Sequence, residues 1–307
     1  MGKARVLVAM SGGIDSSITA MMLREQGYDL VGITMKTWDY HSSGVSTKET
    51  GCCSLDSIQD ARNMAENMDF PHYMLDLREP FEKHIVSNFV DEYLKGRTPN
   101  PCVLCNTHIK WDALLEKADE LECEYIATGH YARIRKEADR YIISRALDDT
   151  KDQSYVLWGL NQDCLSRTIM PLGDYRKEDI RKLAKERGFD NLAHKRESYE
   201  ICFVPDDDYR KFLENKVPDL NARIGEGDFV LKDGTLVGKH RGYPFYTIGQ
   251  RKGLNIALGY PAYVTHIDPN KNIITLGKRE DLEGSELYID QCNFMKYKSV
   301  EHKIEAV

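Results

Sequence analysis

Short apolar runs and amphipathic stretches alternate over the first 130 residues of the chain. Buried strands are predicted for four short runs, at 5–9, 30–35, 72–77 and 125–128. Helices are predicted between them at 16–26, after a Ser54 cap, at 79–94 and from near Lys110. The helix after Ser54 places apolar residues on one face, at Ile58, Ala61, Ala65 and Met68. Strands separated by helices of this length imply parallel crossovers. We therefore predict a doubly wound parallel α/β sheet whose ligand site lies at the carboxyl ends of its strands.

The pattern changes after about residue 205. Glycines at short intervals between 225 and 259 separate brief β-type runs. This texture predicts a small β-rich second domain. The stretch Pro205-Asp206-Asp207-Asp208 is the favoured boundary.

Composition and charge narrow the class of protein. A chain of 307 residues that is 41% hydrophobic and 30% charged can bury a sizeable core. Its apolar runs are far shorter than the ~18 residues of a membrane span, so we expect a cytoplasmic protein with no membrane partner. The net charge of −7 argues against nucleic-acid binding over the whole surface. A basic run is interpreted as a solvated helix face or a phosphate-binding patch: Arg176, Lys177, Arg181, Lys182, Lys185 and Arg187.

The segment after the first predicted strand has the composition of a phosphate-binding loop. Its sequence is Ser11-Gly12-Gly13-Ile14-Asp15-Ser16-Ser17. Glycines let backbone N–H groups approach an anion, hydroxyls add donors, and the helix start contributes its positive end. The ending of a Walker loop and the glycine spacing of a dinucleotide loop are both missing. We predict a pyrophosphate site in which Asp15 holds Mg²⁺ or a backbone amide. An ordinary glycine-rich turn is the alternative.

The cysteines are too few and too scattered for a disulfide scaffold. There are eight, at 52, 53, 102, 105, 123, 164, 202 and 292. Cys102 and Cys105 form a Cys-x-x-Cys pair near a predicted helix and near cations, a setting that lowers the pKa of a thiol. Cys202 has apolar neighbours that could shield a reactive sulfur, although a buried structural cysteine is the simpler interpretation. The other cysteines are given no role.

Six motifs occur in a fixed order along nearly the whole chain. They are the loop at Ser11, Thr98-Pro99-Asn100-Pro101 with Cys105-Asn106, Ala127-Thr128-Gly129-His130-Tyr131, Lys151-Asp152-Gln153-Ser154-Tyr155, Ser198 with Ile201-Cys202-Phe203, and Thr247-Ile248-Gly249-Gln250-Arg251-Lys252-Gly253-Leu254. The loop resembles that of the ATP pyrophosphatases, and together the motifs resemble the tRNA-specific 2-thiouridylase family. The resemblance implies a catalytic domain of the PP-loop (HUP-like) type at 1–204. A small β-rich central domain at 205–275 and an incomplete C-terminal β-barrel segment at 276–307 would follow.

The resemblance also implies roles for individual residues. ATP would contact Ala9, Met10, Ser11, Gly12, Gly13, Ile14, Asp15, Ser16, Met35 and Gly129. The tRNA would contact Asn100, Pro101, Cys102, His130, Lys151, Asp152 and Gln153. Cys105 matches the nucleophilic cysteine of the family, and Cys202 matches the cysteine that carries sulfur as a persulfide.

The implied activity is ATP-dependent 2-thiolation of the wobble uridine in the tRNA anticodon loop. ATP adenylates the C2 oxygen, pyrophosphate leaves, and sulfur then displaces AMP. One cysteine holds the sulfur and another releases it by forming a disulfide. The implied sulfur donor is a cysteine desulfurase, acting directly or through a relay protein.

Cys102 departs from the family pattern. Well-known members have an aspartate at this position, where it is a candidate acid or base. Its replacement favours a [4Fe–4S] cluster on Cys102, Cys105 and Cys202, with persulfide relay as the alternative.

Two other functions stay open at this point. Another ATP pyrophosphatase, such as a tRNA cytidine thiolase or an amidating synthetase, would have the same loop. A non-catalytic zinc or iron–sulfur protein would have the cysteines without the reaction.

Overall fold

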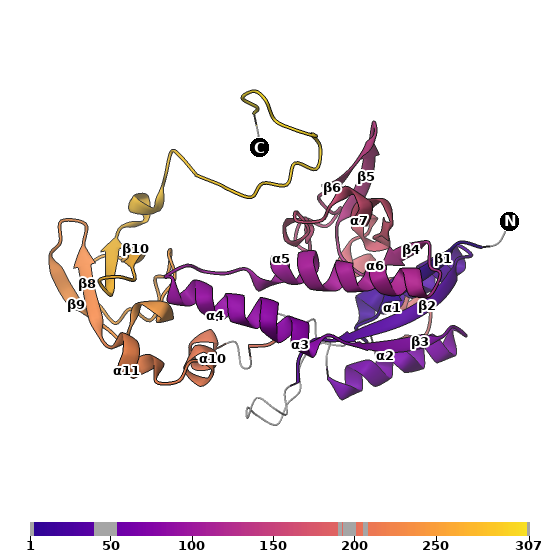
Figure 1. Cartoon of the computed structure of the whole chain (residues 1–307), viewed down its shortest axis with the longest axis horizontal. Helices are drawn as coiled ribbons and strands as arrows, with labels where there is room; N and C mark the ends of the chain where they lie inside the picture. Colours follow the sequence, from indigo (N-terminus) through magenta and orange to yellow (C-terminus); the bar gives the residue numbers. More distant parts are fainter. Residues whose placement is uncertain (1–2, 40–53, 190–191, 193–200, 205–207, 306–307) are drawn as a thin grey trace. The chain divides into compact units, whose positions relative to one another are not determined.

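The computed structural model of the chain describes residues 3–39, 54–189, 192, 201–204 and 208–305 (Figure 1). The chain divides into two compact units. The first comprises residues 1–82, 102–203 and 292–307, and the second comprises residues 83–101 and 204–291.

A five-stranded parallel sheet forms the centre of the first unit. Its order is β3-β2-β1-β4-β7, with β1 at Arg5–Ala9, β2 at Asp29–Lys36, β3 at His72–Asp76, β4 at Tyr125–Ala127 and β7 at Thr168–Ile169. The strand order reverses between β1 and β4. Ligands of open α/β sheets bind at such a reversal, outside the carboxyl ends of the strands. The predicted doubly wound sheet is confirmed.

Helices cover both faces of this sheet. Successive residues of a strand point to opposite faces, and the continuous apolar run of β1 therefore places apolar side chains on both. Leu7 of β1 packs with Trp111 and Leu114 of α6 (Trp111–Glu120). The neighbouring residues Val6 and Val8 pack on the other face, with residues of α1 (Ile14–Glu25) and α2 (Leu55–Asn67). Ser54 caps α2 as predicted, since its side chain accepts a hydrogen bond from the Ser57 N–H at 3.1 Å.

The helix predicted from near Lys110 is found as α6, but the continuous helical run that contains it begins earlier than predicted. It starts at Pro101 and runs through α5 (Pro101–Cys105), a π-helix (Asn106–Lys110) and α6. Proline is favoured at the first helical position, because its φ suits a helix and its missing N–H has no partner there anyway. Both cysteines of the Cys-x-x-Cys pair therefore lie within the first turns of a helix.

The remaining elements of the first unit lie mostly after β4. They are the hairpin β5 (Arg133–Glu137) and β6 (Arg140–Ser144), α7 (Gln162–Ser166), α8 (Lys177–Glu186), and short 3₁₀ turns at Ser154–Val156 and Pro171–Asp174. The predicted helix at 79–94 is found as α3 (Arg78–Phe81), a π-helix (Glu82–Val86) and α4 (Ser87–Leu94). The second unit begins at Lys83, so it contains α4 and residues 83–86 of the π-helix.

The second unit contains the predicted β-rich domain. Its sheet has the order β10-β11-β8-β9, formed by β8 (Gly227–Leu231), β9 (Leu236–His240), β10 (Tyr263–Asp268) and β11 (Ile273–Gly277). Helices α10 (Tyr209–Lys216) and α11 (Leu220–Ile224) precede it, and 3₁₀ turns lie at Tyr243–Phe245 and Arg279–Leu282. Within this unit, Phe89 of α4 packs edge-on against Phe212 of α10. The segment 283–305 has no helix or strand.

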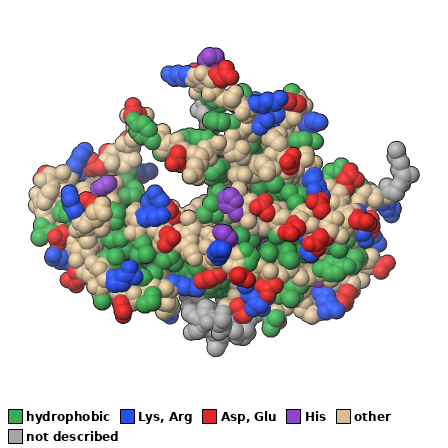
Figure 2. Space-filling model, viewed as in Figure 1, with side chains coloured by type: hydrophobic (Ala, Val, Ile, Leu, Met, Phe, Trp, Pro, Cys, Tyr) green, Lys and Arg blue, Asp and Glu red, His purple; other side chains and the backbone are tan. Residues whose placement is uncertain are grey.

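The surface carries charges of both signs. On the face drawn in Figure 2, basic and acidic side chains are interspersed among apolar and polar ones. None of the helices in the described ranges is long and apolar enough to cross a membrane.

Candidate active site

The predicted phosphate loop connects β1 to α1 at the strand-order reversal. Gly12 has φ +66°, a left-handed conformation that favours glycine. A Cβ at Gly12 would lie 2.0 Å from the carbonyl oxygen of Ser57, so no other residue fits without displacing the backbone. Gly13 occupies the N-cap position of α1 and makes no side-chain cap. The helix start therefore has the character of an anion site.

Two serines give the loop its shape. Ser16 Oγ accepts a hydrogen bond from the backbone N–H of Ser11 at 3.1 Å and donates one to the Gly13 carbonyl at 3.2 Å. The hydroxyls of Ser11 and Ser16 lie 3.3 Å apart. Ser16 is buried whereas Ser11 is exposed. Ser16 thus closes the loop from inside, and Ser11 presents a hydroxyl to solvent.

Gly129, which follows β4, approaches the loop closely. A Cβ at Gly129 would lie 2.9 Å from the backbone nitrogen of Ser16 and 2.9 Å from the carbonyl carbon of Asp15. Met35 lies near the carboxyl end of β2, the neighbour of β1 on the other side. The predicted ATP contacts from three strands therefore share one edge of the sheet.

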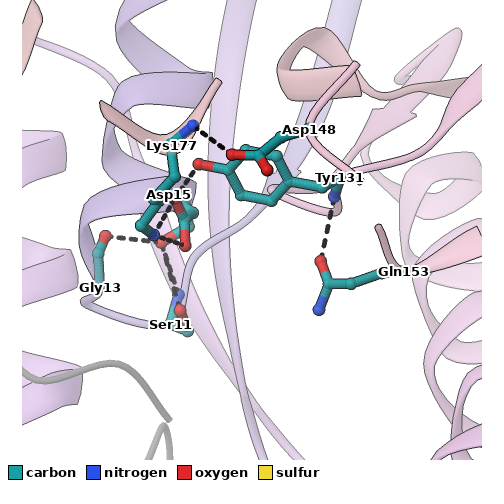
Figure 3. A network of polar contacts seen from close by, with 8 residues as sticks. Ser11, Gly13, Asp15, Tyr131, Asp148, Gln153 and Lys177 are labelled. Carbon is teal, nitrogen blue, oxygen red and sulfur yellow. Dashed lines mark hydrogen bonds and ion pairs between the residues drawn. The ribbon is translucent and has the colours of Figure 1, made fainter. Parts of the chain in front are cut away.

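Asp15 makes an ion pair that the sequence did not predict. Both of its carboxylate oxygens lie 2.7 Å from Lys177 Nζ, and Oδ1 also accepts a hydrogen bond from the Tyr131 hydroxyl at 2.8 Å (Figure 3). We predicted that Asp15 holds Mg²⁺ or a backbone amide, but its carboxylate binds the side chains of Lys177 and Tyr131.

Lys177 is not part of a solvated helix face, because its side chain is only 7% exposed. The sequence did contain a signal for this burial. Lys177, Ile180 and Ala184 share one face of α8 at helical spacing, and all three are buried. Because lysine is charged, Lys177 was grouped with the other basic residues of the helix and not with its apolar positions.

The two cysteines of the pair differ in exposure. Cys102 is exposed, whereas Cys105 is buried and 6% exposed. The π-helix begins directly after Cys105, and short π-helical segments occur frequently at functional sites. Within it, Asn106 is buried and donates a hydrogen bond to the Val156 carbonyl at 3.2 Å.

Cys202 belongs to the same compact unit as Cys105 and is half-buried. Phe203 beside it is 1% exposed and packs against Trp38 and Phe81, with ring centroids 5.9 and 5.5 Å away. The residue next to Cys202 therefore packs in an aromatic cluster, while the apolar setting of the Cys202 thiol itself stays a prediction. Ser198 lies outside the described residues, as do Cys52 and Cys53.

The described residues do not fit an iron–sulfur cluster as they are placed. Among them, no three His, Cys, Asp or Glu side chains come together in a way that could hold a metal ion. Cys102, Cys105 and Cys202 are all described, so this finding applies to the predicted ligand set.

His130 carries no positive charge at neutral pH. Burial is the main cause that lowers its pKa from 6.5 to about 3, and the charge of Lys110 adds to the effect. Its Nδ1 lies 2.9 Å from the Thr128 hydroxyl, and its ring packs on Trp111 at 5.5 Å. A contact with tRNA would therefore use a neutral ring.

The segment 151–153 is held by internal hydrogen bonds. Asp152 accepts hydrogen bonds from the Ala146 N–H at 2.8 Å and from the Ser154 hydroxyl at 2.7 Å. Gln153 and Tyr131 exchange two hydrogen bonds, from the Tyr131 N–H to the Gln153 side chain and from the Gln153 N–H to the Tyr131 carbonyl. Of the other predicted tRNA contacts, Asn100 is exposed, and Pro101 is buried at the start of α5.

We expect the stability of the protein to depend more steeply on pH below 6.5 than that of a His130→Gln variant. The imidazole stays neutral in the folded protein down to about pH 3, but the unfolded chain takes up a proton near pH 6.5. Above pH 6.5 the ring is neutral in both states and the free energy of unfolding keeps its full value. Below pH 6.5 protonation stabilises only the unfolded chain, so the free energy of unfolding decreases progressively as the pH falls. The difference between the proteins should reach up to about 2 kcal/mol at pH 5. Urea unfolding at pH 7.5 and 5.0 measures it, and equal losses in both proteins would contradict the assignment.

A parallel α/β sheet with a glycine-rich anion loop at its strand-order reversal defines a nucleotide-binding domain of the ATP pyrophosphatase class. Two domain families match the chain. The family described as tRNA methyl transferase HUP domain matches residues 4–206, and the one described as tRNA methyl transferase PRC-barrel domain matches residues 210–278.

Several proteins named tRNA-specific 2-thiouridylase MnmA are similar over nearly the whole chain. The protein from Amoebophilus asiaticus is 63% identical over 97% of this chain and 79% of its own length. The one from Cytophaga hutchinsonii is 60% identical over 97% and 81%. One from Clostridium botulinum is 46% identical over 99% and 83%. The chain belongs to the tRNA-specific 2-thiouridylase MnmA family.

Proposed function

We propose that this chain transfers sulfur to C2 of the wobble uridine of tRNA in an ATP-dependent reaction. The observation that carries this proposal is the presence in one compact unit of the anion loop, Cys105 and Cys202, in a chain 60–63% identical to proteins named for 2-thiolation. The domain descriptions mention methyl transfer. Two cysteines in one unit with an ATP loop suit sulfur transfer, which needs a thiol to carry the sulfur and a nucleotide to activate the oxygen that leaves.

The ATP step uses the loop and the adjoining strand ends. The uracil O2 attacks the α-phosphorus of ATP, and pyrophosphate leaves into the site formed by residues 10–16. Backbone N–H groups at the start of α1 and the Ser11 hydroxyl would stabilise the leaving group. We infer that Mg²⁺ arrives with ATP and is held mainly by phosphate oxygens and water, because both oxygens of Asp15 already bind Lys177.

The sulfur step uses two thiols. A cysteine desulfurase or relay protein would convert Cys202 to a persulfide, whose terminal sulfur attacks C2 while AMP leaves with the former uracil oxygen. The Cys105 thiolate then attacks Sγ of Cys202. This breaks the bond to the transferred sulfur and leaves 2-thiouridine and a Cys105–Cys202 disulfide. A cellular thiol reductant would reduce the disulfide and reset the enzyme.

The tRNA contacts inferred from the family remain part of this proposal. Asn100, Pro101 and Cys102 would face the target base, while His130 and residues 151–153 would contact the anticodon arm. We place the reaction in the cytoplasm, where this substrate is found.

The proposal is tested by nucleoside analysis. Unmodified tRNA is incubated with the protein, Mg²⁺, ATP and a persulfide donor, and its nucleosides are then separated by mass spectrometry. We expect 2-thiouridine to form with ATP and to be missing without it. ATP-dependent formation of thiocytidine, or of no thiolated nucleoside at all, would contradict the proposal.

A further inference from the structure

Lys177 is a buried cation whose surroundings fix it next to the phosphate loop. It is the first residue of α8, and its ammonium lies 2.7 Å from both oxygens of Asp15. Its backbone N–H donates a hydrogen bond to Asp148 at 3.0 Å, and its Nζ lies 5.5 Å from the centre of the Tyr131 ring. Figure 3 shows Lys177 and Tyr131 converging on Asp15.

Asp15 presents an electrostatic difficulty for an anion site. It is the second residue of α1, so its carboxylate lies in the helix turn whose N–H groups face the loop. A carboxylate is favourable at a helix start, where it competes with an external anion for the same positive end. Unless it is neutralised, the carboxylate would repel the pyrophosphate group of ATP.

The geometry removes this repulsion. A lysine that is 7% exposed is poorly hydrated and needs a partner of opposite charge. Asp15 is that partner, and the Tyr131 hydroxyl donates a hydrogen bond to the same carboxylate. The pair is neutral as a whole, and its bidentate contact holds the carboxylate in one orientation.

We propose that Lys177 is a positioning residue that neutralises Asp15 and thereby keeps the phosphate loop receptive to pyrophosphate. The inference rests on the proposed ATP site. In the alternative role, the ammonium of Lys177 would bind the phosphate group directly. In the proposed role it acts on the Asp15 carboxylate and does not contact the ligand.

Binding of metal-free inorganic pyrophosphate to the full chain separates these two roles. Calorimetry in the presence of a chelator is done with the wild type, Lys177→Met, Asp15→Asn, the double variant and Lys177→Arg. Lys177→Met exposes the carboxylate and should weaken binding about tenfold or more. The double variant removes both charges, so its affinity for pyrophosphate should lie within about threefold of the wild-type value. Lys177→Arg keeps the ion pair, and its affinity should also stay within about threefold of the wild-type value. Lys298→Met, at an exposed lysine of the same unit that pairs with Asp139, is the control and should leave binding unchanged.

Specific results would overturn the inference. A double variant as weak as Lys177→Met would mean that Lys177 binds the anion itself, and unchanged binding in Lys177→Met would mean that it has no part. If Lys177→Met does not fold in thermal melts, Asp15→Asn carries the test. That variant leaves the lysine charge uncompensated and should bind pyrophosphate at least about threefold more tightly than the wild type. Equal or weaker binding would reject the inference. Failure of these tests in a protein that thiolates tRNA removes this inference alone, whereas a wild type that forms no 2-thiouridine contradicts the proposed function.

Discussion

Serine in place of Cys105 or Cys202 is expected to reduce formation of 2-thiouridine by about 10³-fold or more, the scale seen when a nucleophile is removed. A hydroxyl can neither carry a persulfide nor release one by forming a disulfide. Adenylation uses no thiol, so pyrophosphate should still be released from ATP in the presence of tRNA. Nucleoside mass spectrometry measures the first quantity, and a coupled pyrophosphate assay measures the second.

Two other cysteines give matched controls. Cys292 is exposed and has no proposed role, so Cys292→Ser should retain full activity. Cys102→Ser tests the departure from the family pattern. The proposed relay of sulfur from Cys202 to the base does not use the Cys102 thiol. Its loss should therefore reduce thiolation at most about tenfold, through the proposed contact of Cys102 with the target base. Near-normal thiolation in Cys105→Ser or Cys202→Ser would contradict the two-thiol reaction.

Alanine at Gly12 is expected to weaken ATP binding by about 100-fold or more, which corresponds to about 2.7 kcal/mol. Two causes add at this position. The left-handed φ of +66° strains an alanine, and the new Cβ would lie 2.0 Å from the Ser57 carbonyl oxygen. The loop or the start of α2 must therefore move, and the N–H groups that face the phosphates move with it. Fluorescence titration with an ATP analogue measures the affinity.

Gly27→Ala separates strain from displacement of the loop. Gly27 also has a positive φ, +90°, but a Cβ there meets nothing within 4 Å. This variant should lose about 1 kcal/mol of stability in urea unfolding and keep its affinity for ATP. If both variants lose ATP binding equally, or if neither does, the close approach of Gly12 to Ser57 is not what shapes the site.

The elements nearest the phosphate loop could be predicted from the sequence because their signals are local. The strand at 5–9 is found as predicted, and α1 and β2 differ from their predicted limits by at most two residues. Short continuous apolar runs and the glycine pair are sufficient there, since a strand buried on both faces needs apolar residues at nearly every position. The strand β7, only Thr168–Ile169, was missed because two residues give no periodicity.

The parts of the site that depend on distant contacts could not be predicted in the same way. The pair between Asp15 and Lys177 joins residues 162 positions apart in the chain. Nothing local distinguishes Lys177 from the other basic residues of α8 except its place on the apolar face. The interruption of the first unit by residues 83–101 is likewise a property of tertiary contacts, which a linear pattern does not contain.

The π-helix between Cys105 and Trp111 has a geometric consequence for the direction of the thiol. Trp111 is anchored in the core, where its indole N–H donates to the Thr168 hydroxyl at 3.0 Å. A π-turn accommodates one residue more than an α-turn, and one residue corresponds to about 100° of rotation about the helix axis. Deleting a single residue from 106–110 would leave α6 in place and swing the thiol by roughly that angle. The extra residue of the π-turn therefore sets the direction of the Cys105 thiol relative to α6.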